Sequence, residues 1–151
     1  MASDTPEKKP APKRRRTPSY VKNLRGVRNW KEAREWLQWR SIEDVEAMTP
    51  DLAGVPRGKM MPSVKFTTET SLALPNAVFR QTITGDYPEE TDEFQHDPLD
   101  SDLKLMPDLS TLSVVPWETD PTAQVICDIV STSGKPILYT PRNLLRHVMG
   151  L

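Results

Sequence analysis

The 151-residue sequence has a single cysteine and no long apolar segment. Cys127 has no partner for an internal disulfide and no companion ligands for a zinc cluster, so packing must stabilise the fold. No apolar run approaches the roughly 18 to 20 residues that cross a bilayer, and the first residues include no apolar stretch that could act as a secretion signal. These absences predict a cytoplasmic protein without a membrane partner.

Catalytic motifs are also scarce. The sequence contains two histidines, His96 and His147, and neither lies in a Ser/His/Asp or Cys/His setting. No GxGxxG, GxxxxGKS or GxxxxGKT segment is present to hold a phosphate group. Arg57-Gly58-Lys59 is too short for that purpose and is interpreted as exposed charges on a strand. The residues themselves therefore indicate a domain without a catalytic apparatus of its own.

The net charge of −1 conceals a division along the chain. Residues 1–40 have 12 basic and 4 acidic side chains, whereas residues 41–151 have 8 basic and 17 acidic ones. Residues 1–28 contain 4 prolines and few apolar residues, which predicts a disordered basic arm. The run 13–16 (KRRR) is interpreted as a solvated tail, with contact to nucleic acid or an acidic partner as the alternative. Nucleic acid is disfavoured because the run has no interleaved aromatics for base stacking.

A second charged segment is acidic. Residues 86–102 contain 8 acidic residues, 2 prolines and no Lys or Arg. Such a density of like charge cannot be buried without counter-ions, so the segment is predicted to be an exposed loop. A weak site for a hard cation or a polyamine is the alternative interpretation.

Residues 30–40 have the spacing of a short amphipathic helix, with Asn29 as its N-cap. Three tryptophans, Trp30, Trp36 and Trp39, lie within ten residues of one another. Packing on the core of this chain is the favoured interpretation. A subunit interface is the alternative, because tryptophan is enriched at interfaces.

The rest of the pattern predicts short strands separated by turns. A hairpin is expected from 42–50 and 55–61, joined by a turn at 51–54. Residues 63–72 are a possible helical crossover, and Thr140 and Pro141 are expected to start a helix over 142–149 that the chain ends without completing. Further strands are expected at 76–84, 103–106, 111–115 and 123–130, with a short run at 137–139. The predicted fold class is α+β, a small sheet of five or six strands with flanking helices.

Several Gly, Pro and charged residues in or next to the predicted turns follow one another in a distinctive order. They are Asp51-x-x-Gly54-x-x-Arg57-Gly58-Lys59 on the hairpin, then Pro107-Asp108, Pro116-Trp117, Cys127-Asp128 and Pro141-Arg142. This series resembles the N-terminal β-grasp domain of the glutamine synthetase family, in particular the branch of glutamine-synthetase-like γ-glutamyl-polyamine ligases. The resemblance covers roughly residues 30–151, and it implies structural roles for Asp51, Gly54, Arg57, Gly58, Lys59, Pro107, Asp108, Trp117, Asp128, Pro141 and Arg142.

The resemblance implies an ATP-dependent glutamate–amine ligase. In that family ATP and divalent Mg or Mn activate the γ-carboxyl of glutamate as a phosphate, which an amine then displaces. The groups that hold ATP and metal belong to a C-terminal catalytic domain, so this chain is expected to bind no cofactor and to be inactive alone. The resemblance also implies a ring-shaped homo-oligomer, in which this domain completes the active site of a neighbouring subunit.

The acceptor amine is the point where the sequence departs from the family pattern. A Phe-Asp-Gly-Ser-Ser segment of the family contains an aspartate that helps to bind ammonium, whereas residues 78–83 read VFRQTI. The departure favours a larger amine than ammonium. Clustered carboxylates attract a polycation, so Asp86, Glu89 and Glu90 are candidate amine-binding residues that act in trans.

The expected division is therefore a basic arm (1–28), a β-grasp domain (29–139) and the start of a linker helix (140–151). The alternative function is a non-enzymatic adaptor that binds nucleic acid or an acidic partner through its basic arm.

Overall fold

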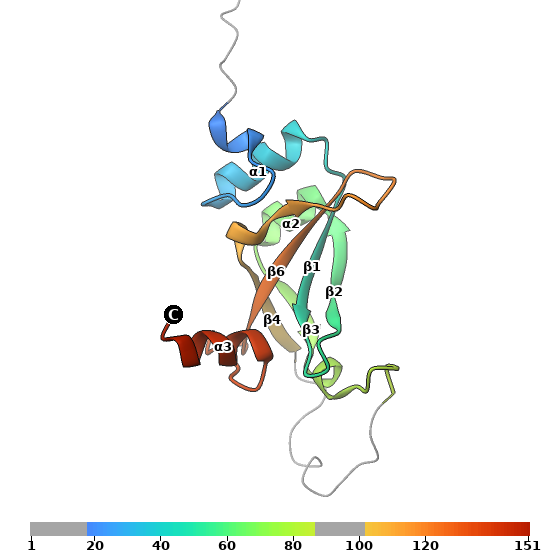
Figure 1. The fold of residues 1–151 in the computed structure, drawn as a ribbon, viewed down its shortest axis with the longest axis vertical. Coiled ribbons are helices and arrows are strands. Elements are labelled where there is room, and N and C mark those ends of the chain that lie inside the picture. Colours follow the sequence, from blue (N-terminus) through green and yellow to red (C-terminus); the bar gives the residue numbers. More distant parts are fainter. Residues whose placement is uncertain (1–17, 87–101) are drawn as a thin grey trace, which may run out of the picture.

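The computed structural model describes residues 18–86 and 102–151, which form a mixed six-stranded sheet with three α-helices. The strand order is β2-β1-β6-β4-β3, and β5 pairs with β6 off this path. Figure 1 shows α1 at one end of the sheet and α3 at the other. The expected α+β class and strand number are confirmed. The strands are β1 (Asp44–Pro50), β2 (Pro56–Pro62), β3 (Leu72–Pro75), β4 (Asp102–Pro107), β5 (Ser113–Val114) and β6 (Thr122–Val130), and the helices are α1 (Trp30–Trp39), α2 (Ser63–Glu69) and α3 (Pro141–Met149).

The predicted hairpin is confirmed as the antiparallel pair β1 and β2, in which Met48 lies opposite Gly58. At Gly58 the two backbones approach so closely that a Cβ atom would lie 1.9 Å from the Ala47 carbonyl oxygen. This contact explains why a glycine occupies the strand, where the residue is otherwise unfavourable.

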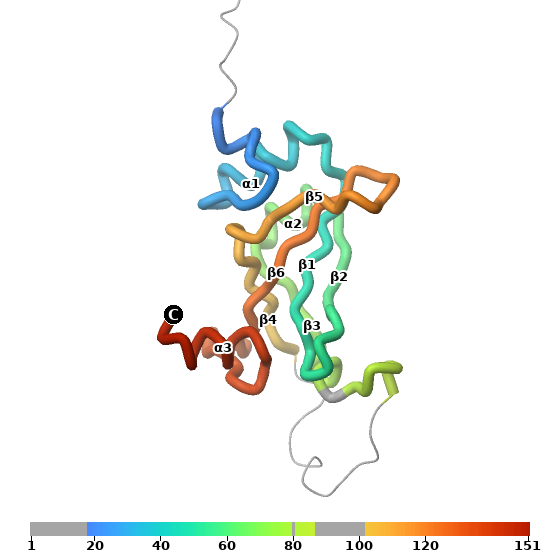
Figure 2. Tube along the Cα trace, in the orientation of Figure 1, coloured from blue at the N-terminus to red at the C-terminus, as the bar shows by residue number. Residues whose placement is uncertain are grey.

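Strand β6 lies at the centre of the sheet, parallel to β1 and antiparallel to β4. Its side chains at Val125, Cys127 and Ile129 are fully buried, as the alternation of side chains along a strand requires. Figure 2 shows β5 as a short segment beside the first part of β6. The other face of the sheet bears half-buried residues, among them Met48 and Ile126.

Helices α1 and α2 pack on the core side. Asn29 caps α1 as predicted, because its side-chain oxygen accepts a hydrogen bond from the Glu32 N–H at 2.9 Å. Trp36 is completely buried, and Trp30 packs against Phe66 of α2 with ring centroids 5.2 Å apart. Trp39 remains 52 % exposed. Core packing is thus confirmed for Trp36 and Trp30, but not for Trp39.

The strand predicted at 76–84 is wrong. The strand in this region is β3, which ends at Pro75, and residues 76–80 form the 3-10 helix η2 (Asn76–Arg80). Asn76 is buried and accepts a hydrogen bond from the Tyr139 hydroxyl, while Phe79 is buried in the core. These two long-range contacts override the strand propensity of the segment.

Three other boundaries need correction. The helical crossover is confirmed but ends earlier than expected, at Glu69, and is followed by Thr70, which has a left-handed backbone with φ of +57°. The strand expected at 111–115 is shorter, because the Asp108 side chain caps the 3-10 helix η4 (Leu109–Thr111) and leaves only β5 as strand. In place of the run at 137–139 there is a single bridge between Val130 and Pro136.

Residues 18–28 are folded against the sheet, so the prediction of a disordered arm over 1–28 is wrong for this part. They include the 3-10 helix η1 (Ser19–Lys22), and both Val21 and Val27 are buried. The Asn23 carbonyl accepts a hydrogen bond from Trp36 Nε1 at 2.9 Å, and the Gly26 N–H donates to the Leu112 carbonyl at 2.7 Å. Residues 1–17, including the run 13–16, lie outside the described residues.

Helix α3 starts at Pro141 as predicted, with Thr140 in the N-cap position, although the Thr140 hydroxyl donates to the Ile137 carbonyl and makes no capping bond. The expectation of an incomplete helix is wrong. Gly150 has a left-handed backbone with φ of +70°, and its N–H bonds back to the helix, which is a regular C-terminal cap.

Candidate functional site

One end of the sheet gathers the motif residues that the sequence singles out. The turn between β1 and β2, the turn at 82–86 that follows η2, and the start of α3 all lie at the end opposite to α1 (Figure 1). Because β1 and β6 are parallel, their C-terminal residues reach this end together.

Asp51 organises the hairpin turn. Its side chain is 2 % exposed and accepts hydrogen bonds from the Ala53 N–H at 2.9 Å, the Val55 N–H at 2.8 Å and Arg57 Nε at 2.9 Å. Burial by itself would raise the pKa of Asp51. The hydrogen bonds from Arg57, Val55 and Ala53 outweigh it, so the pKa is lowered from its ordinary value of 3.8.

Arg57 connects this turn to the next one. While its Nε binds Asp51, its terminal nitrogen donates to the Thr82 carbonyl at 3.0 Å. The turn 82–86 is closed by the Thr82 N–H, which donates to the Asp86 carbonyl at 2.8 Å. The Asp86 carboxylate is exposed and accepts from the Thr84 hydroxyl at 2.8 Å. A chain of contacts thus fixes Asp86 relative to the hairpin.

A second polar cluster attaches α3 to the sheet. Arg142 binds Asp128 at 2.6 Å through Nε and also pairs with Asp108, while Arg146 lies 3.1 Å from Asp108 and 3.0 Å from Asp128. Burial would raise the pKa of Asp108. Its hydrogen bonds from Ser110 and the charges of Arg142 and Arg146 outweigh that effect and lower the pKa.

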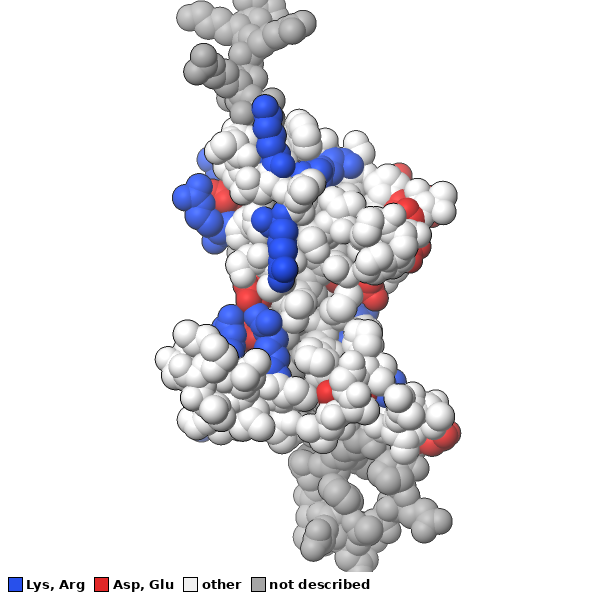
Figure 3. All heavy atoms as spheres, viewed as in Figure 1, with Lys and Arg blue, Asp and Glu red and all other residues white. Residues whose placement is uncertain are grey.

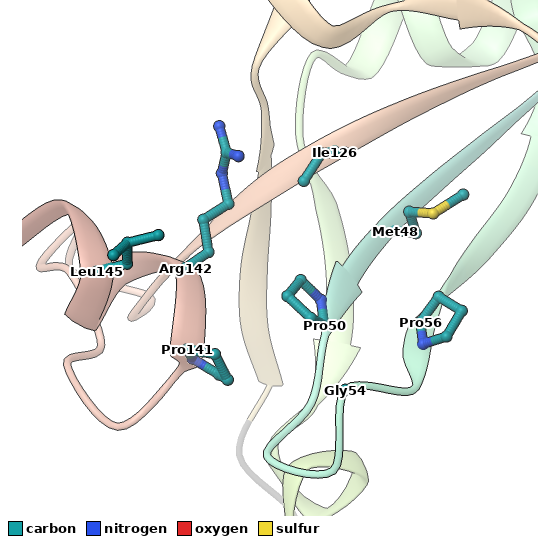
Figure 4. Close-up of a pocket in the computed structure, with 8 residues that line it drawn as sticks. All are labelled: Met48, Pro50, Gly54, Pro56, Ile126, Pro141, Arg142 and Leu145. Atoms are coloured by element: carbon teal, nitrogen blue, oxygen red, sulfur yellow. The ribbon is translucent and has the colours of Figure 1, made fainter.

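A groove of about 390 Å³ separates the hairpin from α3. Figure 4 shows residues of β1 and β2 on one side, α3 on the other, and Ile126 of β6 between them. Only one lining residue is charged, and that residue, Arg142, is already paired with two carboxylates. The groove is therefore an apolar surface. Its lining comprises Met48, Pro50, Gly54, Pro56, Ile126, Pro141, Arg142 and Leu145.

The structure brings together most of the predicted motif residues, though not all of them. Gly54 has a left-handed backbone with φ of +80° in the hairpin turn, and Pro107 ends β4 directly before Asp108. Lys59 is exposed on β2. Trp117 is 70 % exposed in the loop between β5 and β6, away from both polar clusters. Of the three candidate amine-binding residues, Glu89 and Glu90 lie outside the described residues.

Sequence reasoning missed two residues of this site. Arg146 lies one helical turn after Arg142 and contacts the same carboxylates, and the i,i+4 spacing of the two arginines was the available signal. Asn143 is buried, and its side chain accepts a hydrogen bond from the Ile129 N–H at 3.3 Å. No local sequence pattern predicts that contact.

The described residues include two other reactive side chains, Cys127 and His147. Cys127 is fully buried, and burial raises its pKa to about 12, so its thiolate is suppressed. His147 is exposed on α3, and His96 lies outside the described residues. Within 18–86 and 102–151, no three His, Cys, Asp or Glu residues are grouped so that they could hold a metal ion. In the same residues no helix has the length and apolarity to cross a membrane.

Comparison with known proteins identifies the family. No family model matches the chain. The glutamate–isopropylamine ligase of a Pseudomonas species is 33 % identical over 121 residues, which cover 78 % of this chain and 26 % of the ligase. The glutamine synthetase of Methanococcus maripaludis is 51 % identical over 53 residues, 32 % of this chain and 11 % of that protein. The chain thus spans about a quarter or less of these curated relatives.

The fold agrees with the sequence comparison. The cryo-EM structure of Plasmodium falciparum glutamine synthetase matches 83 % of this chain and 22 % of its own length, with a TM-score of 0.61 and 17 % identity. The sheet and helices described above therefore have the fold of the N-terminal region of glutamine synthetase. The chain belongs to the glutamine synthetase family.

Proposed function

We propose that the chain is the β-grasp domain of an ATP-dependent glutamate–amine ligase and that it completes the active site of a neighbouring subunit in a ring. The observation that carries this proposal is the 33 % identity to a glutamate–isopropylamine ligase over 78 % of the chain. Because the aligned part is 26 % of that ligase, we assign ATP binding, divalent metal binding and phosphoryl transfer to the remaining part of the enzyme.

The apolar groove supports a role in subunit contact. Met60 and Met106 on the same face of the sheet are 58 % and 40 % exposed, and Leu145 beside the groove is 59 % exposed. Exposed apolar side chains around a groove favour an interface with another protein. In this proposal the groove face packs against the catalytic domain of the next subunit.

We further propose that Asp86 contributes to the binding of the acceptor amine. Its carboxylate is exposed, and its position is fixed through Thr82 and Arg57 to the buried Asp51. A fixed, exposed carboxylate attracts a cationic substrate by charge. Glu89 and Glu90 remain candidates on sequence grounds.

A hybrid enzyme tests the role of Asp86. In the Pseudomonas ligase, the N-terminal region is replaced by this chain, and the Michaelis constants for 1,4-diaminobutane and for isopropylamine are measured. Asp86→Lys is expected to raise the constant for the diamine by about tenfold and to raise that for the monoamine less, because the diamine has two positive charges. Asp120→Lys, the same change in the exposed loop between β5 and β6, serves as the control. An unchanged constant for the diamine in Asp86→Lys would contradict the assignment.

A further inference from the structure

The end of the molecule formed by η1 and α1 is mainly basic. In residues 18–40 the exposed charged side chains are all basic: Lys22, Arg25, Arg28, Lys31 and Arg34. Both acidic residues of this segment are half-buried and engaged in hydrogen bonds. Glu32 accepts from the Arg28 N–H at 3.0 Å, and Glu35 accepts from the Tyr20 hydroxyl.

The contact between Tyr20 and Glu35 joins η1 to α1. The hydrogen bond to Glu35 is the main reason that the pKa of Tyr20 is raised to about 12. Figure 3 shows Lys and Arg side chains gathered over this end of the molecule.

Hydrogen bonds hold the backbone of the segment that contains these basic residues. The Asn23 carbonyl accepts from Trp36 Nε1 at 2.9 Å and from Arg40 at 2.8 Å, which ties η1 to α1. Arg25 forms a bridge with Ser113 of β5. Lys22, Arg25 and Lys31 pair with no carboxylate in the part of the chain that the structure describes. Within residues 18–86 and 102–151 these three charges have no acidic counterpart.

A recess lies beside Arg28 at this end of the molecule. It has a volume of about 320 Å³ and is bordered by η1, the start of α1 and η4, with Tyr20, Asn23, Arg28 and Ser110 among its lining residues. Its lining includes one basic residue, Arg28, and one acidic residue, Glu32.

The exposed apolar residues of this end favour a polypeptide over a nucleic acid. Leu24 is 79 % exposed between Lys22 and Arg25. Trp39 is the half-exposed aromatic, and the Arg40 guanidinium lies 5.2 Å from its ring centroid, so that face of the ring is covered. Single-stranded nucleic acids bind by stacking their bases on aromatic rings. The Trp39 ring offers only one uncovered face for such stacking.

We propose that this basic end, defined by Lys22, Arg25, Arg28, Lys31 and Arg34, binds an acidic segment of another protein. The segment has carboxylates that pair with the basic side chains and an apolar residue that contacts Leu24. The surface lies at the opposite end of the sheet from Asp86 (Figure 1). The inference is thus independent of the proposed ligase function.

The test measures binding of a fluorescein-labelled peptide of four Glu-Glu-Leu repeats to the full 151-residue chain by fluorescence anisotropy at 100 mM salt. The triple variant K22E/R25E/K31E is compared with K65E/K104E/K135E, which makes the same change in net charge on exposed lysines elsewhere. We expect about tenfold weaker binding for the first variant and less than about twofold for the second, because exposed ion pairs are local at this ionic strength. Circular dichroism confirms that both variants are folded.

Two further experiments distinguish this surface from residues 13–16 as the binding site, and an acidic peptide from a nucleic acid as the ligand. In K13A/R14A/R15A/R16A the basic run of residues 13–16 is removed, and most of the binding should persist. A 20-base-pair DNA duplex and a 20-nucleotide uridine RNA replace the peptide, and both should bind more weakly than the peptide does. Equal losses in the two triple variants, loss only in the 13–16 variant, no binding of the peptide, or tighter binding of DNA or RNA would each overturn the proposal.

Discussion

Arg57 Nε lies 2.9 Å from Asp51 Oδ2, and the same guanidinium group donates to the Thr82 carbonyl. Asp51 is buried and has three donors around it. One ion pair therefore sets both the shape of the hairpin turn and the position of the turn that contains Asp86.

Loss of the Asp51 carboxylate should be strongly destabilising. Asp51→Ala leaves two backbone N–H groups and Arg57 Nε without an acceptor, and we expect a loss of about 3 kcal/mol in the free energy of unfolding. Asp51→Asn keeps an acceptor oxygen and should cost about half as much. Urea unfolding followed by circular dichroism measures both, and equal stability of Asp51→Ala and the wild type would contradict the role of the pair.

Stability should fall in acid. The pKa values of Asp51 and Asp108 are lowered in the folded state from the ordinary 3.8, so their contribution is fully present above that value. It is lost as the pH falls through the lower folded-state values. Unfolding measured between pH 6 and pH 2 should show this decline, and Asp51→Asn should flatten it. A wild-type curve with no decline below about pH 4 would be inconsistent with the lowered values.

Gly58 should tolerate no side chain. A Cβ atom there would lie 1.9 Å from the Ala47 carbonyl oxygen and 2.8 Å from the Met48 Cα, so β1 and β2 must separate. We expect Gly58→Ala to cost about 3 kcal/mol or more, as overpacking against backbone does. Gly134→Ala is the control, because its Cβ meets nothing within 4 Å and only its φ of +84° is unfavourable. That change should cost about 1 kcal/mol.

Arg142 should hold α3 on the sheet more strongly than Arg146 does. Arg142 is 20 % exposed and bridges Asp108 and Asp128, whereas Arg146 is 44 % exposed. Arg142→Ala should therefore cost about 2 kcal/mol and Arg146→Ala less than about 1 kcal/mol. Hydrogen exchange of the Leu145 amide reports the release of the helix. Equal exchange in the two variants would assign the attachment of α3 to its apolar contacts.

Local chemistry accounts for what the sequence predicted well. The Asn29 cap, the 51–54 turn and Pro141 act within a few residues of themselves, so the helices and the hairpin were accessible to pattern reasoning. The errors arise where distant residues decide. Phe79 and Asn76 are buried against elements far along the chain, and residues 18–28 fold because Asn23 and Gly26 bond to α1 and to Leu112.

In the candidate site, too, the local features were predicted and the long-range contacts were not. The motif order pointed to Asp51, Arg57, Asp108, Asp128 and Arg142, and the structure joins them in two clusters. The link from Arg57 to Thr82 spans 25 residues and that from Arg146 to Asp108 spans 38, so neither has a local signature. The division between domain and linker helix at 139/140 and the cytoplasmic location stay predictions.

The most direct measurement is the activity of the hybrid in which this chain replaces the N-terminal region of the Pseudomonas glutamate–isopropylamine ligase. ADP release is followed with glutamate and amine present together and with each omitted. We expect release that requires both substrates in the hybrid, and none from this chain alone or from the ligase without its N-terminal region. A hybrid that assembles to the size of the parent ligase but releases no more ADP than the shortened ligase would contradict the proposed function.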